Sequence, residues 1–463
     1  MDALVIGSGP AGVMAALRAA ELGARTTLVA RDRFGGMAAG DGPVPVRTLA
    51  HAARLIREAR QLKQYGIEIG EPVLDYRRLL ARVQEVVGAV QDHSLLRKQV
   101  DQLGITLHEK AGPARFVDPH TVEGDAHLRL TADRIILCPG GRSRRLDVPG
   151  SDLTLTHSDA WSLTEVPPSM LVIGAGMTGL QVASIFQAFG TQVQLLQSGP
   201  RILAGEDPDV SAALAAELRA GGMVVREGFG TIERFEAIPG GIRMTFAKDG
   251  VRGSVEAALA VRTIGWVANT EGLNLESAGV ELDAKGFVKV DRFLCTAAEH
   301  IFAAGDATGR FMLVPPAVLD GHVAATNAVQ GPTLPREDRA GPTAGFTDPE
   351  YGHIGATEAA ARQQGDVVVS RVGFGETVRT VIDGRTSGFC KLIADRKSGT
   401  ILGCHVVGER AADIVQVAAI AMEGRLRVQD LARVPLAFPT YSGILARAAY
   451  RAAREIDPSL VAP

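Results

Sequence analysis

Two glycine-rich turns are the segments of this sequence whose residue types and spacing could do chemistry most directly. Each follows the pattern Gly-x-Gly-x-x-Gly, and the glycines are Gly7, Gly9 and Gly12 in the first turn and Gly174, Gly176 and Gly179 in the second. In such a turn the first glycine permits a tight bend, the second lets a phosphate approach the backbone, and the third lets a helix pack closely on a strand. The helix N-terminus then offers free N–H groups and a positive dipole end. Both turns therefore predict binding of a dinucleotide pyrophosphate.

Each turn needs a strand before it and a helix after it, and the sequence supplies both. An apolar run at 3–6 precedes the first turn, and an amphipathic segment that ends near Leu22 follows it. The run 170–173 precedes the second turn, and a helical segment that ends near Phe189 follows it. One such turn is weak evidence, because glycine turns are common, and a simple turn stays an alternative for either one. Two of them, each between a strand and a helix, favour two nucleotide-binding units.

Further predicted strands end in turns between and after these units. One strand covers 132–138 and ends at a Pro-Gly-Gly turn, and another covers 253–263. A third strand, at 301–304, ends in a glycine followed by Asp306. The polar, proline-bearing segment 332–342 predicts a linker.

After the linker the pattern changes to that of a separate α+β domain. We expect strands near 366–372 and 378–382, a hairpin around 395–399, and helices near 410–424 and 442–455. Cys390 and Cys404 flank the hairpin, so we expect them to face one another without forming a bond in a reducing compartment.

The composition excludes several classes of protein. The chain has 463 residues, 46% apolar and 22% charged, so about three globular domains of roughly 150 residues each are expected. Lys and Arg number 49 against 52 Asp and Glu, so nucleic acid is not an expected partner. No apolar run approaches the ~18 residues of a membrane-spanning helix, and an apolar strand that begins at Ala3 leaves no room for a signal peptide. The four cysteines include no close pair, so we expect a reduced, cytoplasmic protein without a disulfide scaffold or a metal site.

The motifs of this chain resemble those of the flavoprotein disulfide reductases, the class I pyridine nucleotide-disulfide oxidoreductases. That family includes dihydrolipoamide dehydrogenase, glutathione reductase and mercuric reductase. The resemblance covers nearly the whole chain in motif order and spacing. The segments that carry it are 7–12 (GSGPAG), 34–36 (FGG), 139–141 (PGG), 174–179 (GAGMTG), 269–280, 304–306 (AGD), 346–350 (FTDPE), 401–403, 407–408 and 438–440 (FPT).

The resemblance implies an α/β fold with two Rossmann-like dinucleotide-binding domains and a C-terminal α+β dimerisation domain. Residues 1–150 would form the first part of an FAD-binding domain, 151–268 an NAD(P)-binding domain, and 269–335 the second, central part of the FAD-binding domain. Residues 340–463 would form the dimerisation domain. A homodimer is therefore expected, in which this domain completes the flavin pocket of the other subunit.

The resemblance also implies FAD and NADH or NADPH as cofactors. Asp306 would accept a hydrogen bond from the ribityl chain of FAD, and 313–317 would line the flavin. The FAD positions are Gly7, Gly9, Gly12, Gly35, Gly36, Arg47, Ala114, Gly140, Asp306 and Ala317. The NAD(P) positions are Gly174, Gly176, Gly179, Gln197, Arg201 and Gly265.

The sequence departs from this family at the positions that carry its thiol chemistry. Members have two cysteines separated by four residues after a glycine pair, and the matching positions here are Ala38 and Pro43, which cannot form a thiolate or a disulfide. The His-Glu base pair of the family, contributed by the partner subunit, corresponds to Phe438 and Gly443. Because thiols and base are absent together, the sequence favours chemistry that uses no disulfide.

A Lys-Glu pair that members have near the flavin reads Arg47 and Gln181 here, so the cation is kept and the carboxylate is not. We take Arg47, Gln181 and Tyr441 as the catalytic candidates. Arg47 could stabilise an anionic flavin or the developing oxyanion of an acceptor. Tyr441 lies beside Phe438, and the two rings could stack on a flat acceptor, although plain interface packing is an equal alternative.

The residue that ends the second strand of each unit is not acidic. Ala30 in the first unit would cost FAD its ribose hydrogen bonds unless Asp32 reaches across. In the second unit Gln197 neither repels nor binds a 2′-phosphate. Arg201 could meet such a phosphate, although a solvated surface arginine is the more common state. The nucleotide preference stays open and leans towards NADH.

The leading hypothesis is an FAD-dependent NAD(P)H oxidoreductase that passes electrons from the reduced flavin directly to a small-molecule acceptor such as a quinone or dye. A pyridine nucleotide transhydrogenase is a rival, because Gln197 is ambivalent. A non-catalytic flavin-binding redox sensor or interaction protein is the third hypothesis, since the lost thiols and acidic residues would suit a protein without turnover.

Overall fold

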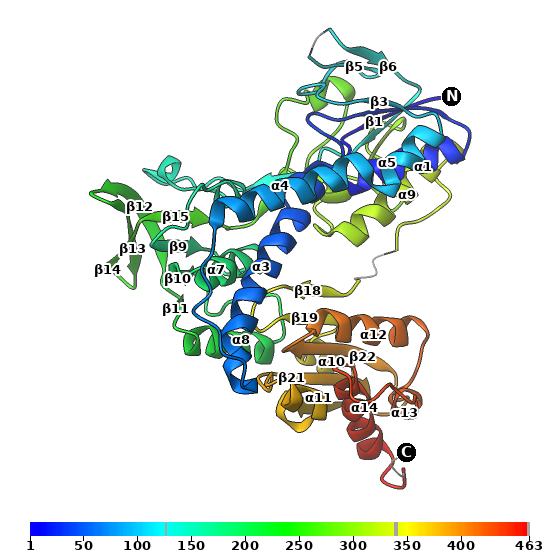
Figure 1. Ribbon diagram of the computed structural model, residues 1–463. Helices are drawn as coiled ribbons and strands as arrows, with labels where there is room; N and C mark the ends of the chain where they lie inside the picture. Colours follow the sequence, from blue (N-terminus) through cyan, green and yellow to red (C-terminus); the bar gives the residue numbers. More distant parts are fainter. Residues whose placement is uncertain (126, 338–340, 461–463) are drawn as a thin grey trace.

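Three larger sheets with their helices make up most of the molecule (Figure 1). The computed structural model describes residues 1–125, 127–337 and 341–460. Positions 338–340 of the predicted linker, which include the first residue of the predicted dimerisation domain, and the terminal 461–463 lie outside the described residues. Within the described ranges, no helix combines the length and the apolar character needed to cross a membrane.

The first sheet is parallel and is built from two distant parts of the chain. Its order is β17-β7-β1-β2-β3, with β1 (Asp2–Ile6), β2 (Arg25–Val29), β3 (Thr106–His108), β7 (Arg134–Leu137) and β17 (Ile301–Ala303). The continuous apolar runs are buried on both faces, as helices on a parallel sheet require. The helices nearest to it are α1 (Pro10–Glu21), α5 (Leu95–Gln102) and α9 (Val314–Gln330). α1 and α9 pack so closely that a Cβ on Gly321 would lie 2.1 Å from the carbonyl oxygen of Ala11.

The second parallel sheet repeats this plan around the second glycine turn. Its order is β11-β10-β9-β15, with β9 (Ser169–Ile173), β10 (Gln192–Gln197), β11 (Val224–Glu227) and β15 (Leu259–Arg262). Its helices are α7 (Met177–Ala188) and α8 (Pro208–Ala220). An antiparallel sheet of β12 (Thr231–Ile238), β13 (Gly241–Lys248) and β14 (Val251–Ala257) adjoins it.

The prediction of a single strand at 253–263 is wrong. The chain divides at Ala258, and the segment contains the end of β14 and the whole of β15. The backbone N–H of Ala258 donates to Oγ of Ser169 at 2.9 Å, where the chain passes from the antiparallel sheet to the parallel one. An apolar run carries no mark of which sheet it joins, so the change of partner is invisible in the sequence.

The third sheet belongs to the C-terminal part of the chain. Its order is β18-β19-β22-β21-β20, with β18 (Thr343–Gly345), β19 (Tyr351–Gly355), β20 (Val367–Gly373), β21 (Phe389–Asp395) and β22 (Ile401–Val407). The helices around it are α10 (Glu358–Gln364), α11 (Val378–Ile382), α12 (Ala411–Glu423), α13 (Val428–Ala432) and α14 (Gly443–Ile456). The predicted hairpin, which joins β21 to β22, and the two long helices are confirmed. The sulfur atoms of Cys390 and Cys404 lie 4.0 Å apart across β21 and β22 as free, buried thiols.

The strand predicted at 378–382 is wrong, because these residues form the helix α11. Their branched side chains favour a strand by composition. Val378, Val381 and Ile382, however, are spaced as on one face of a helix, and all three are exposed. In this segment the helical spacing of the apolar residues indicates the observed structure, and the strand-favouring composition does not.

Two long helices, α3 (Pro43–Gln61) and α4 (Tyr76–His93), pack against each other, and α3 also packs against α7 of the second unit (Figure 1). The remaining elements are the short helices α2 (Gly36–Gly40) and α6 (His157–Trp161), the pair β8 (Gly141–Ser143) and β16 (Trp266–Ala268), the sheet of β4 (Arg115–Asp118), β5 (Thr121–Glu123) and β6 (Arg129–Thr131), and the 3-10 turns η1 (Leu62–Tyr65), η2 (Ser151–Leu153), η3 (Leu275–Ala278), η4 (Gly305–Thr308) and η5 (Phe374–Glu376). The predicted α/β fold, two Rossmann-like units followed by an α+β domain, is confirmed.

A buried ion cluster joins the second unit to the C-terminal sheet. Nζ of Lys391 on β21 lies 3.1 Å from Oδ1 of Asp207, the residue that caps α8, and 3.0 Å from Oδ2 of Asp209. Glu358 of α10 completes the cluster at 2.6 Å. The side chains of Lys391 and Asp207 are 4% and 1% exposed, whereas those of Glu358 and Asp209 are 29% and 42% exposed, so the cluster is buried at its centre and reaches water at its edge.

Candidate active site

One cavity of about 1360 Å³ lies where the two glycine turns approach each other. Its lining comes from both parallel units, from α3 and α4, and from Ala344 of the C-terminal part. It exceeds the ~300–1,000 Å³ of a typical small-molecule site. A cavity of this size, open to both turns, has room for two nucleotide-type ligands that meet.

The first turn has the geometry of a phosphate cradle. Gly7 has a φ of +105°, and a Cβ on Gly12 would lie 1.7 Å from the Gly7 carbonyl oxygen, so both positions require glycine. A Cβ on Gly9 would meet nothing within 4 Å and would point into open space. Gly9 is the N-cap of α1 and offers no side-chain cap, so the first N–H groups of the helix are left for an anion.

The second turn repeats this geometry. Gly174 has a φ of +99°, and a Cβ on Gly179 would lie 1.9 Å from the Gly174 carbonyl oxygen. A Cβ on Gly176 would again meet nothing within 4 Å. The side chain of Gln197 accepts a hydrogen bond of 2.9 Å from the backbone N–H of Ala175, which fixes this amide beside the turn.

The segment 34–47, which follows β2 and runs through α2 into the start of α3, contains no cysteine. Ala38 and Pro43 both line the cavity. Gly36 lies against the first turn, since a Cβ there would be 2.8 Å from Cα of Gly9. Cys138 also lines the cavity, but it is buried in the turn after β7, and this burial raises the pKa of its thiol.

Arg47 and Gln181 meet across the boundary between the two units. Nη1 of Arg47 donates a hydrogen bond of 3.3 Å to Oε1 of Gln181, and the guanidinium lies over the ring of Phe346. Burial lowers the pKa of Arg47 to about 10, so this side chain keeps its charge at neutral pH. A cation with a neutral partner is thus held at the wall of the cavity.

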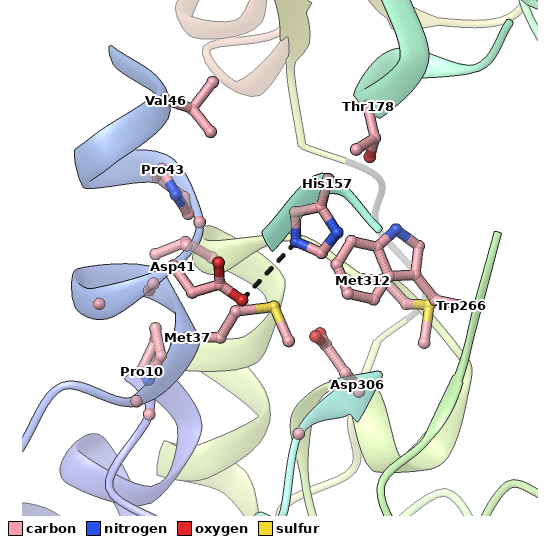
Figure 2. Close-up of a pocket in the computed structure, with 18 of the residues that line it drawn as sticks. Pro10, Met37, Asp41, Pro43, Val46, His157, Thr178, Trp266, Asp306 and Met312 are labelled. Carbon is pink, nitrogen blue, oxygen red and sulfur yellow. Dashed lines mark ion pairs between the residues drawn. The ribbon is translucent and has the colours of Figure 1, made fainter. Parts of the chain in front are cut away.

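Asp306 lies in the cavity at the end of β17 (Figure 2). Burial, with a further contribution from the charge of Asp320, raises the pKa of Asp306 to about 6. Asp320 itself forms a buried ion pair with Arg336, at 2.5 Å between Oδ1 and Nε. Among the residues that the structure describes, none forms an ion pair with Asp306, so this carboxyl group suits a neutral hydroxyl donor.

Most of the residues predicted from the sequence line this cavity. Those that do are Gly7, Gly9, Gly36, Ala38, Pro43, Arg47, Gly140, Gly174, Gly176, Gln181, Gln197, Gly265, Asp306 and Ala317. Ala30 is not among them, whereas Asp32 is. Gly12, Gly35 and Gly179 lie just behind the lining, where they let the backbone pack.

Four predicted residues lie elsewhere. Ala114 is buried in the core of the first unit. Arg201 donates to the carbonyl oxygens of Glu206 and Ala204, at 3.0 and 2.7 Å, so its guanidinium is held by its own loop. Tyr441 and Phe438 belong to the C-terminal domain, outside the cavity lining of their own chain.

The hydroxyl of Tyr441 donates a hydrogen bond of 2.6 Å to Oδ2 of Asp383, and burial together with this bond raises the pKa of the tyrosine. Phe438 is 82% exposed. The ring of Tyr441 is therefore held by a hydrogen bond within its own domain, whereas the ring of Phe438 is exposed and can contact another chain.

The sequence analysis missed a pair of polar side chains, Asp41 and His157, that line the cavity across from Asp306 (Figure 2). Asp41 and His157 face each other there, with Oδ2 and Nε2 3.8 Å apart, and the imidazole packs edge-on against Trp266 with ring centroids 4.8 Å apart. The available signal was Asp41 itself, a carboxylate between the two thiol positions. Its histidine partner lies more than a hundred positions later in the sequence, beyond the reach of any local pattern.

The chain is similar to known proteins over nearly its full length. Residues 1–321 match the family described as pyridine nucleotide-disulphide oxidoreductase, and residues 341–449 match its dimerisation domain. A dihydrolipoyl dehydrogenase of Bacillus subtilis is 30% identical over 459 residues, which cover 97% of this chain and 95% of that protein. A dihydrolipoyl dehydrogenase of Mycobacterium tuberculosis is 32% identical and covers 96% of each chain.

Solved structures show the same similarity. LpdA from Mycobacterium tuberculosis matches with a TM-score of 0.87 at 26% identity, over 97% of this chain and 99% of that one. The HOCl-induced flavoprotein disulfide reductase RclA from Escherichia coli matches with a TM-score of 0.86, over 97% and 99% of the two chains. At 23% identity the likeness to RclA shows the fold alone.

Proposed function

This chain belongs to the pyridine nucleotide-disulphide oxidoreductase family, which uses FAD and NAD(P)H, and we propose that it transfers electrons from NAD(P)H through FAD to an acceptor that is not a disulfide. A quinone or a dye is the acceptor class that we propose. The observation that carries this proposal is the segment 34–47, which lines the cavity without a cysteine.

The residues present fit both cofactors. Gly9 and Gly176 each leave open space where a Cβ would stand, at the N-termini of α1 and α7, so each turn can accept a pyrophosphate. Asp306 can accept a hydrogen bond from a sugar-like hydroxyl. When bound, FAD would supply the hydride and electron chemistry that no side chain can supply.

The side chains around the thiol positions set what the acceptor can be. Ala38 and Pro43 are small and carry no nucleophile, so they leave room and form no covalent bond with a substrate. Arg47 retains its positive charge beside the neutral Gln181. A cation at this wall favours an acceptor that develops negative charge on oxygen as it is reduced.

The test is an anaerobic titration of the FAD-loaded protein with NADH and with NADPH, followed by mixing with acceptors. We expect the flavin absorbance to bleach and then return on addition of a benzoquinone or a dye. We expect no reduction of lipoamide, glutathione disulfide or mercuric ion. Reduction of lipoamide at a comparable rate would contradict the proposal, and failure to bleach with either nucleotide would favour a flavin-binding sensor without turnover.

Hydride transfer between NADH and NADPH is the second candidate. It is supported by Gln197, a neutral amide held beside the second turn by Ala175, which neither repels nor pairs with a 2′-phosphate. Exchange of hydride between NADPH and an NAD analogue, measured without any other acceptor, separates this activity from quinone reduction.

A further inference from the structure

Four polar side chains form a connected row along one wall of the cavity. The hydroxyl of Ser158 donates a hydrogen bond of 2.6 Å to Oδ2 of Asp41. Oγ of Ser158 also lies 3.4 Å from Nε2 of His157. The hydroxyl therefore bridges Asp41 and His157, which are too far apart for a direct hydrogen bond. On the other side of the imidazole, Nδ1 of His157 shares a hydrogen bond of 3.1 Å with Oγ of Ser143. The order of the row is Asp41, Ser158, His157, Ser143.

The fold holds this row in place from three separate elements. Asp41 follows α2, between Ala38 and Pro43 in the sequence. His157 and Ser158 begin α6, whose start is fixed by a capping box between Thr156 and Asp159. Ser143 ends β8, opposite Trp266 of β16. The row is therefore rigid, and it lies next to the space that the two thiols would occupy.

Both ends of the row reach the cavity. Asp41, His157 and Ser143 all line it. The side chain of His157 is only 5% exposed, whereas that of Asp41 is 37% exposed. Asp41 is thus the end that exchanges protons with water, and the imidazole, in the interior of the row, is shielded from it.

The surroundings bring the pKa of Asp41 and the pKa of His157 closer to each other. Burial raises the pKa of Asp41, against the opposing effect of the Ser158 hydrogen bond, and burial lowers the pKa of His157, against the charges of Asp41 and Asp159. Asp306 is the other carboxyl group that faces His157 across the cavity (Figure 2). A proton that moves between groups of similar affinity meets a small energetic cost.

We propose that Asp41, Ser158, His157 and Ser143 form a proton relay that protonates the electron acceptor. The proposal rests on the proposed function. Asp41 takes a proton from solvent and passes it through the Ser158 hydroxyl to Nε2 of His157. The proton on Nδ1 then leaves through Ser143 to a carbonyl oxygen of the acceptor.

The relay closes the proton count of the proposed reaction. A quinone that becomes a hydroquinone gains two electrons and two protons, and it forms two O–H bonds. The hydride of NAD(P)H brings both electrons and one proton. The relay supplies the second proton from solvent and leaves the charge of every residue in the row unchanged. The imidazole ends with its proton on Nε2 instead of Nδ1, and return of that proton to Nδ1 through water, with reorientation of the two hydroxyls, resets the row before the next turnover. The substrate class that follows is a two-electron acceptor with a carbonyl oxygen, rather than a one-electron metal complex.

The first test compares two acceptors in the oxidative half-reaction. Benzoquinone must be protonated on reduction, whereas ferricyanide takes electrons without a proton. In the FAD-loaded His157→Gln protein, we expect reoxidation by benzoquinone to slow by ~10²-fold and reoxidation by ferricyanide to stay within twofold. His51→Gln, at an exposed histidine of α3, is the control and should change neither rate. Equal slowing with both acceptors, or with neither, overturns the relay.

The second test does not depend on turnover. NMR titration of the histidine side chains, with the His157 signal assigned by its loss in His157→Gln, measures the proton affinity of this imidazole. Asp41→Asn should lower the pKa of His157 further, because the carboxylate that favours the charged ring is gone. In the first test, by contrast, Ser158→Ala should also slow reoxidation by benzoquinone while leaving FAD content unchanged. An unchanged His157 titration in Asp41→Asn overturns the relay, even if the protein proves to reduce no quinone and the proposed function fails on its own.

Discussion

Arg47 of α3 donates a hydrogen bond of 3.3 Å to Gln181 of α7, and this contact joins the two dinucleotide units at the cavity wall. The amide of Gln181 is itself held by its donation to the Met177 carbonyl at 3.3 Å. Because Gln181 is neutral, it orients the guanidinium without cancelling its charge. The carboxyl group that contributes most to holding the charge on Arg47 is Glu350, whose own pKa burial raises to about 7.

We predict that Gln181→Glu makes the flavin midpoint potential more negative. The new carboxylate would cancel part of the Arg47 charge, and a loss of ~1 kcal/mol of stabilisation shifts a two-electron potential by ~20 mV. A spectroelectrochemical titration measures it. Gln187→Glu, on the same helix but bound to the Gly221 carbonyl at the surface, is the control. A shift of equal size in the control, or a positive shift, contradicts the role of Arg47.

Gly9 and Gly12 should respond in opposite ways to replacement by alanine. Gly9→Ala meets no protein atom within 4 Å, so the FAD-stripped protein should keep its melting temperature, while the purified protein should lose bound FAD. Gly12→Ala places a Cβ 1.7 Å from the Gly7 carbonyl oxygen and should destabilise the fold by ~1–3 kcal/mol. Thermal melting and the ratio of flavin to protein absorbance separate the two effects. Unaltered FAD content in Gly9→Ala would show that the phosphate does not approach this turn.

The nucleotide preference should depend on Gln197 and not on Arg201. Gln197→Glu keeps the hydrogen bond from Ala175 and adds a charge that repels a 2′-phosphate, so the ratio of kcat/KM for NADH to that for NADPH should rise about tenfold. Arg201→Ala should leave this ratio unchanged and lower Tm, because the guanidinium is bound to backbone carbonyls. A strong loss of NADPH activity in Arg201→Ala would mean that the loop opens to release this side chain.

Asp306 should make the FAD-stripped protein less stable as pH rises. Its pKa is about 6 in the folded chain because of burial and is lower in the unfolded chain, so the unfolded state ionises first. Stability from this group is complete below the unfolded pKa and is lost as pH rises through about 6. Asp306→Asn removes this loss, on the order of 2 kcal/mol in urea unfolding between pH 4.5 and 7.5. Asp101→Asn, at an exposed residue of α5, is the control for the removal of one carboxyl group.

Phe438 should contribute to association of two chains. It is 82% exposed in the single chain and lies within the segment that matches the family dimerisation domain. Phe438→Asp should weaken the dimer, because a charge at an apolar contact is costly to bury. Analytical ultracentrifugation across a dilution series measures this. Val251→Asp, at a side chain 71% exposed on β14, is the control and should leave the association unchanged.

Much of the fold was predictable because it is encoded locally. The two glycine turns, their flanking strands and helices, and the hairpin between β21 and β22 all depend on residues close together in the sequence. The segment 378–382 was misread because its composition and its spacing favour different structures. The hydrogen bonds of Arg201 were not predictable, because its carbonyl acceptors depend on the path of its own loop, in which Leu203 has a φ of +46°.

The polar row in the cavity was not predictable for a different reason. Asp41 and Ser158 are separated by 117 positions, and neither lies in a motif. Ser143 meets His157 only because β8 pairs with β16 and α6 packs beside them. Such a row is a product of tertiary structure, and a single sequence carries no periodicity that would reveal it.

The Lys391 cluster has a mechanical consequence for the whole assembly. Pulling α8 away from β21 would separate the ammonium group of Lys391 from Asp207 and Asp209 and leave it paired with Glu358 of the C-terminal part alone, and breaking ion pairs of a buried lysine in this way is costly. The second dinucleotide unit is therefore braced against the C-terminal sheet rather than hinged on it. In a dimer built through that sheet, the second dinucleotide units of both chains would keep a fixed position relative to the dimer interface. Any opening that admits a ligand would then have to come from movement of the first unit or of side chains at the cavity mouth.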